Sequence, residues 1–232
     1  MKLFCCHTPA HEVLFREYFR PSVPAGFLLS DYRLEIAGAG DFLSAEFLDC
    51  IRKKVGLIVR SIEDNPDEWI VWSDVDIVFL DGIESSLDRI TKGPEVLFFQ
   101  RESPRLPDVN TGFLVIRTCP QTREFFERIG RLLEEKPGLN EQMAANQLLQ
   151  EGFSIPWSHL PNSFYARTHG WPMPRDAVLY HANYTKSADA VGQKIAQFRE
   201  LAWIRRWGVL AWYWSCVRRI PSAAMRRISG RA

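Results

Sequence analysis

Two aspartates separated by one residue, Asp74 and Asp76, are the side chains of this sequence best suited to chemistry. They interrupt an apolar stretch, residues 69–80, in which Ser73 is the other polar residue. Buried carboxylates are costly without a partner, so the pair needs a cation or a dense set of hydrogen-bond donors. Alternate side chains of an extended chain share a face, so both aspartates can approach one hard cation such as Mg²⁺ or Mn²⁺. The alternative is a solvated strand end whose acids cap neighbouring amides.

The elements that would position this pair follow from hydrophobic periodicity. Residues 69–80 predict one central strand that is covered on both faces. Further apolar runs predict strands, and helical spacing predicts a first long helix over 43–62. The other expected strands are 3–7, 95–99, 112–117, 153–157 and 178–181, and the other expected helices are 11–19, 122–135 and 140–150. Alternating strands and helices predict an α/β domain with a central, mostly parallel mixed sheet, in which ligands gather at the carboxyl ends of the strands.

Composition indicates the size of the domain and the redox environment of its cysteines. A chain of 232 residues with 46% hydrophobic residues can form one domain with a sizeable core. No stretch of about 18 uncharged apolar residues predicts a membrane-spanning helix. The five cysteines are scattered without a CxxC pair, which favours reduced thiols in a cytoplasm over a zinc site.

The net charge of +1 hides an asymmetry along the chain. From Lys194 onward there are nine basic residues and one acidic residue, so the body of the protein is acidic and its tail basic. We therefore divide the chain into a domain at 1–186 and a helical basic and aromatic extension at 187–232. The extension interleaves two residue types: Trp203, Trp207, Trp212, Tyr213 and Trp214 with Arg205, Arg206, Arg218 and Arg219. This mixture indicates possible peripheral contact with a membrane through residues 203–231, or else a helix that packs on the domain or on a second copy. Nucleic acid is not expected as a partner, because the body is acidic.

Three further segments follow the acidic pair in a recognisable order. They are residues 108–113 (DVNTGF), 140–147 (NEQMAANQ) and 180–183 (YHAN). Together with residues 72–79 (WSDVDIVF), they resemble GT-A fold glycosyltransferases, closest to the nucleotide-diphospho-sugar transferase group that includes plant cell-wall xylosyltransferases and bacterial and viral members. The resemblance covers about residues 1–185. It implies a single GT-A, Rossmann-like domain that transfers a sugar, with a uridine-diphosphate sugar as the default donor and a glycan or lipid-linked acceptor.

The resemblance also implies a metal site. Asp76 would bind Mn²⁺ or Mg²⁺ directly, and Asp74 would serve the ribose or reach the metal through water. His181 would be the late ligand, a role that suits a neutral imidazole. The alternative for His181 is a core histidine at the end of a strand.

Donor-binding residues follow from the same resemblance. Asn110 and Gly112 would line the donor sugar, where glycine allows close backbone approach and an amide can both donate and accept. His7 and Thr8 would meet the nucleobase or ribose at the end of the first strand. Within Arg52-Lys53-Lys54, Lys54 is the best candidate for the diphosphate. The alternatives are a plain turn at residues 110–112 and a solvated helix face at residues 52–54.

The resemblance also implies that catalysis belongs to Glu141 and Gln142. In an inverting enzyme Glu141 would be the general base that takes the proton of the acceptor hydroxyl. In a retaining enzyme the same segment would orient the donor sugar. Glu141 stands where relatives commonly have aspartate, so the stereochemical outcome stays open. A helix-start role for Glu141, near the positive end of the helix dipole, is the alternative.

Three other functions fit parts of the sequence. A haloacid-dehalogenase-type phosphatase would use Asp74 as its nucleophile, but it needs a later acidic pair that is missing here. A sugar-1-phosphate nucleotidyltransferase needs a glycine-rich basic loop after the first strand, and residues 5–10 (CCHTPA) offer none. A non-catalytic glycan-binding protein on a transferase fold would not need the metal ligands Asp76 and His181.

Overall fold

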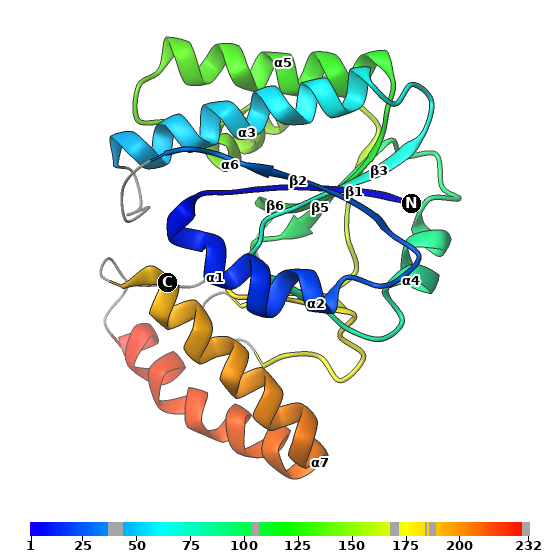
Figure 1. Ribbon diagram of the computed structural model, residues 1–232. Helices are drawn as coiled ribbons and strands as arrows, with labels where there is room; N and C mark the ends of the chain where they lie inside the picture. The colour runs from blue at the N-terminus through cyan, green and yellow to red at the C-terminus, as the bar shows by residue number, and fades with distance from the viewer. Residues whose placement is uncertain (37–43, 104–106, 168–171, 184, 186–188, 229–232) are drawn as a thin grey trace.

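A six-stranded mixed sheet forms the centre of the protein (Figure 1). The computed structural model describes residues 1–36, 44–103, 107–167, 172–183, 185 and 189–228, with side chains described as far as residue 217. The strand order is β2-β1-β3-β6-β5-β7, in which β6 runs against its two neighbours and the other pairings are parallel. The strands are β1 Lys2–His7, β2 Leu28–Arg33, β3 Trp69–Ser73, β5 Leu97–Arg101, β6 Val109–Arg117 and β7 Trp157–His159. The mostly parallel mixed sheet predicted from the sequence is confirmed.

Both faces of the sheet are buried, because alternate residues of its central strands enter two different hydrophobic clusters. On β3, Ile70 and Trp72 pack against one layer of helices, whereas Val71 packs against the opposite layer. The first layer consists of α3 (Ala45–Glu63), α5 (Pro120–Glu135) and α6 (Glu141–Gln150), which lie above the sheet in Figure 1. The prediction of a central strand covered on both faces is therefore confirmed.

The second layer combines the N-terminal helical segment with the tail. That segment is a chain of short pieces, η1 (Pro9–His11), α1 (Glu12–Leu14), the π-helical η2 (Phe15–Phe19) and α2 (Arg20–Ser22), where the sequence predicts one helix over 11–19. Helix α4 (Ile83–Ile90) contributes Ile83 and Leu87 to the hydrophobic cluster on this side. Figure 1 shows α1 and α2 on the side of the sheet opposite α3 and α5, and α4 beside one end of the sheet.

The expected strand over residues 69–80 is not continuous, which corrects the sequence prediction. β3 ends at Ser73, and β4 (Ile77–Phe79) belongs to a second sheet of order β4-β9-β8, with β8 at Phe164–Ala166 and β9 at Leu179–His181. Residues 74–76 form the bend between the two sheets. The physical reason is that β6 and β9 each hydrogen-bond one side of the break, so the chain leaves one sheet and enters the other at the acidic pair.

Helix α7 (Ala190–Ile228) makes up the tail and folds back on itself at Gly208, whose φ of 60° is left-handed (Figure 1). Glycine adopts this conformation without the steric cost that other residues bear. The apolar residues Phe198, Leu201, Ile204 and Ala211 join the core cluster that includes β4 and β9. The helical character predicted for the tail is confirmed, and part of the tail packs on the domain.

Candidate active site

A cavity of about 150 Å³ opens at the carboxyl ends of β1 and β3, as expected for a parallel sheet. Its walls come from the end of β1, the first turns of α3, the β3–β4 bend and α7. The residues that bear on the argument are Cys6, His7, Thr8, Lys54, Asp74, Asp76 and Lys194. The cavity thus joins three of the predicted site residues, His7, Thr8 and Lys54, to the acidic pair.

The acidic pair is fixed by the two strands that flank it. The backbone N–H of Asp74 donates to the Gly112 carbonyl of β6 (2.7 Å), and the Asp76 carbonyl accepts from Ala182 N–H (2.9 Å). We expected strand alternation to place both carboxylates on one face, but residues 74–76 lie outside the strands, so this expectation is wrong. Instead, backbone bonds to β6 and to the residue after β9 hold them at the bend, beside His181.

His181 is oriented by Gln100, a residue that the sequence analysis does not single out. The amide of Gln100 donates to the Phe164 carbonyl (3.0 Å), so its Oε1 accepts from His181 Nδ1 (2.7 Å). The neutral tautomer with Nδ1–H then leaves the Nε2 lone pair pointing at Asp76 Oδ1, 3.3 Å away. A buried hydrogen bond on the far nitrogen is the usual way in which a metal-binding histidine is fixed.

A divalent metal fits this arrangement. Asp76 Oδ1 is buried and has no hydrogen-bond partner, although the Nε2 atom of His181 lies opposite it. Two lone pairs that face each other in a buried place repel unless a cation lies between them or the imidazole is protonated. One ligand atom each from Asp74, Asp76 and His181 lies within 4.8 Å of the others. Carboxylate oxygens and an imidazole nitrogen suit Mn²⁺, and the oxygens alone suit Mg²⁺.

Gly112 makes room for the histidine. A Cβ atom at this position would lie 2.3 Å from His181 Cε1 and 3.0 Å from Nε2. The Gly112 N–H in turn donates to Asn110 Oδ1 (2.9 Å). Both residues lie within β6, which begins at Val109 and not at residue 112 as predicted, so the alternative of a plain turn at residues 110–112 is wrong. Gly112 therefore lies against the imidazole of His181, the third member of the candidate metal-binding group.

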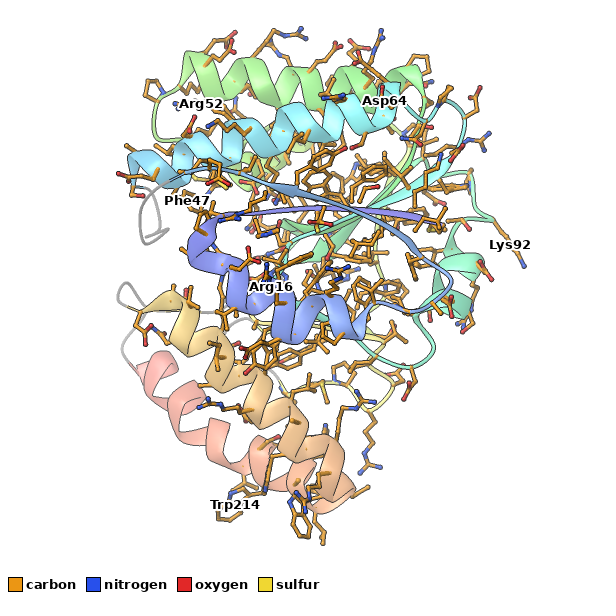
Figure 2. The ribbon with its side chains drawn as sticks, in the orientation of Figure 1. Arg16, Phe47, Arg52, Asp64, Lys92 and Trp214 are labelled. Atoms are coloured by element: carbon orange, nitrogen blue, oxygen red, sulfur yellow. The ribbon has the colours of Figure 1, made fainter. Side chains whose placement is uncertain are left out.

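Lys54 is a buried cation held on three sides. Its ammonium donates to Asp74 Oδ1 (2.7 Å), Glu141 Oε1 (2.9 Å) and the Thr111 carbonyl (3.3 Å). Burial by itself would lower the pKa of Lys54, but Asp74 and Glu141 outweigh it and raise this pKa above the usual range. Arg52 and Lys53 are exposed, and Figure 2 shows Arg52 on the outer side of the helix layer. Of these three residues, Lys54 is the one that lines the cavity, and its contact with a diphosphate stays a prediction.

Lys194 is a second cation at the pair, and it comes from the tail. Its Nζ lies 2.7 Å from Asp76 Oδ2, and its side chain keeps 16% of its exposure. Burial tends to raise the pKa of Asp76, but the ammonium of Lys194 holds this pKa well below its usual range. Residue 194 belongs to the predicted extension, for which no role in the site was predicted.

Glu102 links two of the predicted residues on the other side of β6. Its Oε2 accepts from Asn110 Nδ2 (2.7 Å) and from Gln142 Nε2 (3.3 Å). Asn146 of α6 pairs with both backbone groups of Val109, donating to its carbonyl (3.0 Å) and accepting from its N–H (2.8 Å). These bonds attach α6, and with it Glu141 and Gln142, to the strand that carries Asn110 and Gly112.

His7 and Thr8 both line the cavity, and their contact with a nucleobase or ribose stays a prediction. The His7 ring stacks on Phe15 with centroids 4.3 Å apart, and its Nε2 bonds Glu12 Oε2 (3.0 Å). Thr8 Oγ1 bonds His11 Nδ1 (2.9 Å). Burial and the nearby Lys194 lower the pKa of His11 to about 4, so His11 is neutral near pH 7.

Three residues of the site were not predicted from the sequence: Gln100, Glu102 and Lys194. Gln100 and Glu102 lie at the end of β5, one strand beyond the strand that carries the asparagine and glycine, and no motif marks them. A polar residue directly after the apolar run 97–99 was the available signal. Lys194 begins the basic tail, and nothing in the sequence places it 118 residues back beside Asp76.

Comparisons with known proteins agree with this geometry. The sequence matches the family model described as nucleotide-diphospho-sugar transferase over residues 29–195. No curated protein matches the sequence. A glycosyltransferase involved in glycosylation of the major capsid of PBCV-1 is 17% identical, with a TM-score of 0.62 over 84% of this chain and 98% of that one.

Two further solved structures share the fold. The galactosyltransferase LgtC, in complex with donor and acceptor sugar analogs, is 13% identical, with a TM-score of 0.55 over 87% of this chain and 95% of that one. The glycosyltransferase GlyE of Streptococcus pneumoniae is 11% identical, with a TM-score of 0.54 over 96% of this chain and 63% of that one. At these identities the likenesses bear on the fold alone, which is the GT-A glycosyltransferase fold.

The family match spans most of the chain and includes the acidic pair, the asparagine–glycine strand, α6 and His181. It also disfavours the phosphatase alternative in which Asp74 is a nucleophile. The chain belongs to the nucleotide-diphospho-sugar transferase family and is a glycosyltransferase.

Proposed function

We propose that this glycosyltransferase is metal-dependent and uses a uridine-diphosphate sugar as its donor and a glycan or lipid-linked molecule as its acceptor. The ion, Mn²⁺ or Mg²⁺, would be held by Asp74, Asp76 and His181. The observation that carries the proposal is the buried Asp76 Oδ1, unpartnered and 3.3 Å from an imidazole nitrogen, beside an open cavity. When bound, such an ion would supply Lewis-acid stabilisation of the charge on the departing diphosphate.

The other residues of the site would contact different parts of the donor, according to where they lie. His7 and Thr8, at the cavity wall, would contact the nucleobase or ribose. Lys54 holds Asp74 in place and lends positive charge to the diphosphate region. Asn110 and Gly112 would bound the donor sugar on the far side of the acidic pair, where Asp74 N–H is already bonded to the Gly112 carbonyl.

Glu141 and Gln142 remain our proposed catalytic residues. The ion pair between Glu141 Oε1 and Lys54 fixes the orientation of the carboxylate. In an inverting reaction Glu141 would accept the acceptor's proton, and in a retaining one the Glu141–Gln142 pair would orient the donor. The anomeric configuration of the product, measured by NMR, distinguishes these roles. Replacing Glu141 by Gln should abolish transfer in the first case and mainly weaken donor binding in the second.

The proposed function is tested by donor-dependent stabilisation. A panel of nucleotide sugars is screened by thermal denaturation with and without Mn²⁺, together with sugar-nucleotide hydrolysis. We expect at least one uridine-diphosphate sugar to raise the melting temperature only when metal is present. Asp76→Ala should remove this effect, whereas Cys119→Ala, a change far from the site, should leave it. Stabilisation that is indifferent to both metal and Asp76 would refute the proposal.

We also propose that the tail contacts a membrane surface. Its helical hairpin leaves large apolar side chains exposed, and Figure 2 shows Trp214 at its outer end, pointing away from the sheet. The most exposed are Trp207 (60%), Leu210 (81%) and Trp214 (57%). Arg205 and Arg206 lie on the same helix, and aromatic rings with arginines suit an anionic lipid headgroup layer. No helix among the described residues is long and apolar enough to cross a bilayer.

Vesicle sedimentation tests this contact. Binding should occur to vesicles that contain anionic lipid and not to neutral ones, and the triple change Trp207→Ala, Leu210→Ala, Trp214→Ala should remove it. Leu28→Ala, which removes an equally exposed apolar side chain on β2, is the matched control. Binding that survives the triple change would contradict the proposal. Such contact fits a cytoplasmic enzyme of glycan biosynthesis at the inner face of a membrane, with 1–186 as the transferase domain and 187–232 as its extension.

A further inference from the structure

The two lysines of the site hold the acidic pair in different ways. Lys54 is 4% exposed and bonds two carboxylates and a carbonyl, so it is fixed from three sides. Lys194 is 16% exposed and, within the part of the chain that is described, its one recorded bond is to Asp76 Oδ2 (2.7 Å). Lys194 also lines the cavity, so its ammonium can turn toward a ligand there without a movement of α7. Lys54 is a permanent part of the site, whereas Lys194 is releasable.

The position of Lys194 conflicts with metal binding. Its ammonium sits on one oxygen of Asp76, and the other oxygen is the one that faces His181 Nε2. An ammonium at 2.7 Å and a divalent ion compete for the same carboxylate, because each is attracted by its single negative charge. A metal that enters the site must therefore loosen this ion pair.

The charge balance indicates when Lys194 leaves. Asp74, Asp76 and Glu141 face Lys54 and Lys194, which leaves the cluster one negative charge in excess. Without Lys194 the excess is two, which a divalent ion neutralises. A nucleotide diphosphate in the cavity offers the freed ammonium new anionic oxygens.

We infer that the ammonium of Lys194 stays paired with the Asp76 carboxylate until a divalent metal and a nucleotide diphosphate bind together. The ammonium then moves from this carboxylate to the diphosphate. Lys194 then makes metal binding depend on the donor. Each ligand raises the affinity of the other, because each removes part of the cost of releasing Lys194. Lys194 is a positioning residue of the site, and this inference rests on the metal and donor site proposed above.

The test is a pair of Mn²⁺ titrations by calorimetry, with and without UDP, on the full-length protein. Removing the competing charge with Lys194→Met should tighten Mn²⁺ binding without UDP by about tenfold or more, as expected for a charged hydrogen bond. The same variant should weaken UDP binding in the presence of Mn²⁺ by about tenfold. The factor by which UDP strengthens Mn²⁺ binding should fall accordingly.

Two variants control this experiment. Lys194→Arg keeps the positive charge and should preserve the weak Mn²⁺ affinity of the unmodified protein. Arg205→Met removes a charge from the same helix, at a surface pair with Asp81, and should change neither titration. Circular dichroism melts establish that each variant is folded.

The outcomes separate this inference from the proposed function. If the unmodified protein binds neither Mn²⁺ nor UDP, both fail. If it binds both, but Lys194→Met leaves the affinity for Mn²⁺ alone unchanged or weaker, only the role of Lys194 is wrong. An equal gain in Arg205→Met would also overturn it, since the effect would then be one of overall charge.

Discussion

Replacing Gly112 by alanine tests whether the His181 ring position matters to the site. The added Cβ would lie 2.3 Å from Cε1 of the ring, so the ring must retreat by about 1 Å to reach ordinary van der Waals contact. The ring is 97% buried and tied to Gln100 through Nδ1, so it cannot retreat freely. Overpacking of this kind costs about 1–3 kcal/mol, offset by about 0.4–1 kcal/mol from the stiffer unfolded chain. We expect a net loss of about 1–2 kcal/mol in the free energy of unfolding.

The effect on metal binding should be larger than the effect on stability. Metal–ligand distances tolerate only about 0.2 Å of change, whereas the ring moves about five times as far. We expect the affinity for Mn²⁺ in the presence of UDP to fall by about 10- to 100-fold. Urea denaturation and Mn²⁺ calorimetry provide the two measurements.

Gly56→Ala is the matched control for this prediction. Gly56 lies in α3 with open space around the added methyl group, so alanine there should stabilise the helix by up to about 1 kcal/mol and leave Mn²⁺ binding unchanged. If Gly112→Ala binds Mn²⁺ as tightly as the unmodified protein, then either the ring is not a ligand or its position is not fixed by this strand. Either result would refute our reasoning about the cluster.

Two further substitutions probe the groups that hold the ligands. Gln100→Leu removes the acceptor of His181 Nδ1, and we expect about tenfold weaker Mn²⁺ binding, measured by calorimetry; an unchanged affinity would contradict a positioning role. Lys54→Met leaves Asp74 and Glu141 without their buried cation, and we expect a loss of about 3–5 kcal/mol in urea denaturation. Adding Glu141→Gln to that variant should restore part of the loss, whereas Lys53→Met, at an exposed pair, should cost less than about 1 kcal/mol; equal losses from both lysines would count against the buried ion pair.

The element types and the acidic pair of the candidate metal site could be predicted from the sequence, because both are encoded locally. Helical spacing marks α3, α5 and α6, whose observed bounds lie within two residues of those predicted. Asp74 and Asp76 were found by their chemical type and their apolar flanks, and His181 was found through the family resemblance; the structure brings one ligand atom of each within 4.8 Å of the others. By contrast, the edge strand β2 and the short β8 were missed, and β7 begins where the expected strand 153–157 ends. β2 is exposed at most positions and carries little hydrophobic pattern.

Only the tertiary structure decided how the cluster is held. The bend at residues 74–76 depends on hydrogen bonds to Gly112 and to Ala182, which lie far along the chain. The ion pair of Lys54 with Glu141 spans 87 residues, and the bond between His181 and Gln100 spans 81. Periodicity in a sequence reports the environment of neighbouring residues, whereas such pairs depend on which strands the sheet places side by side. The same holds for Lys194, whose contact with Asp76 exists because α7 packs against the second sheet.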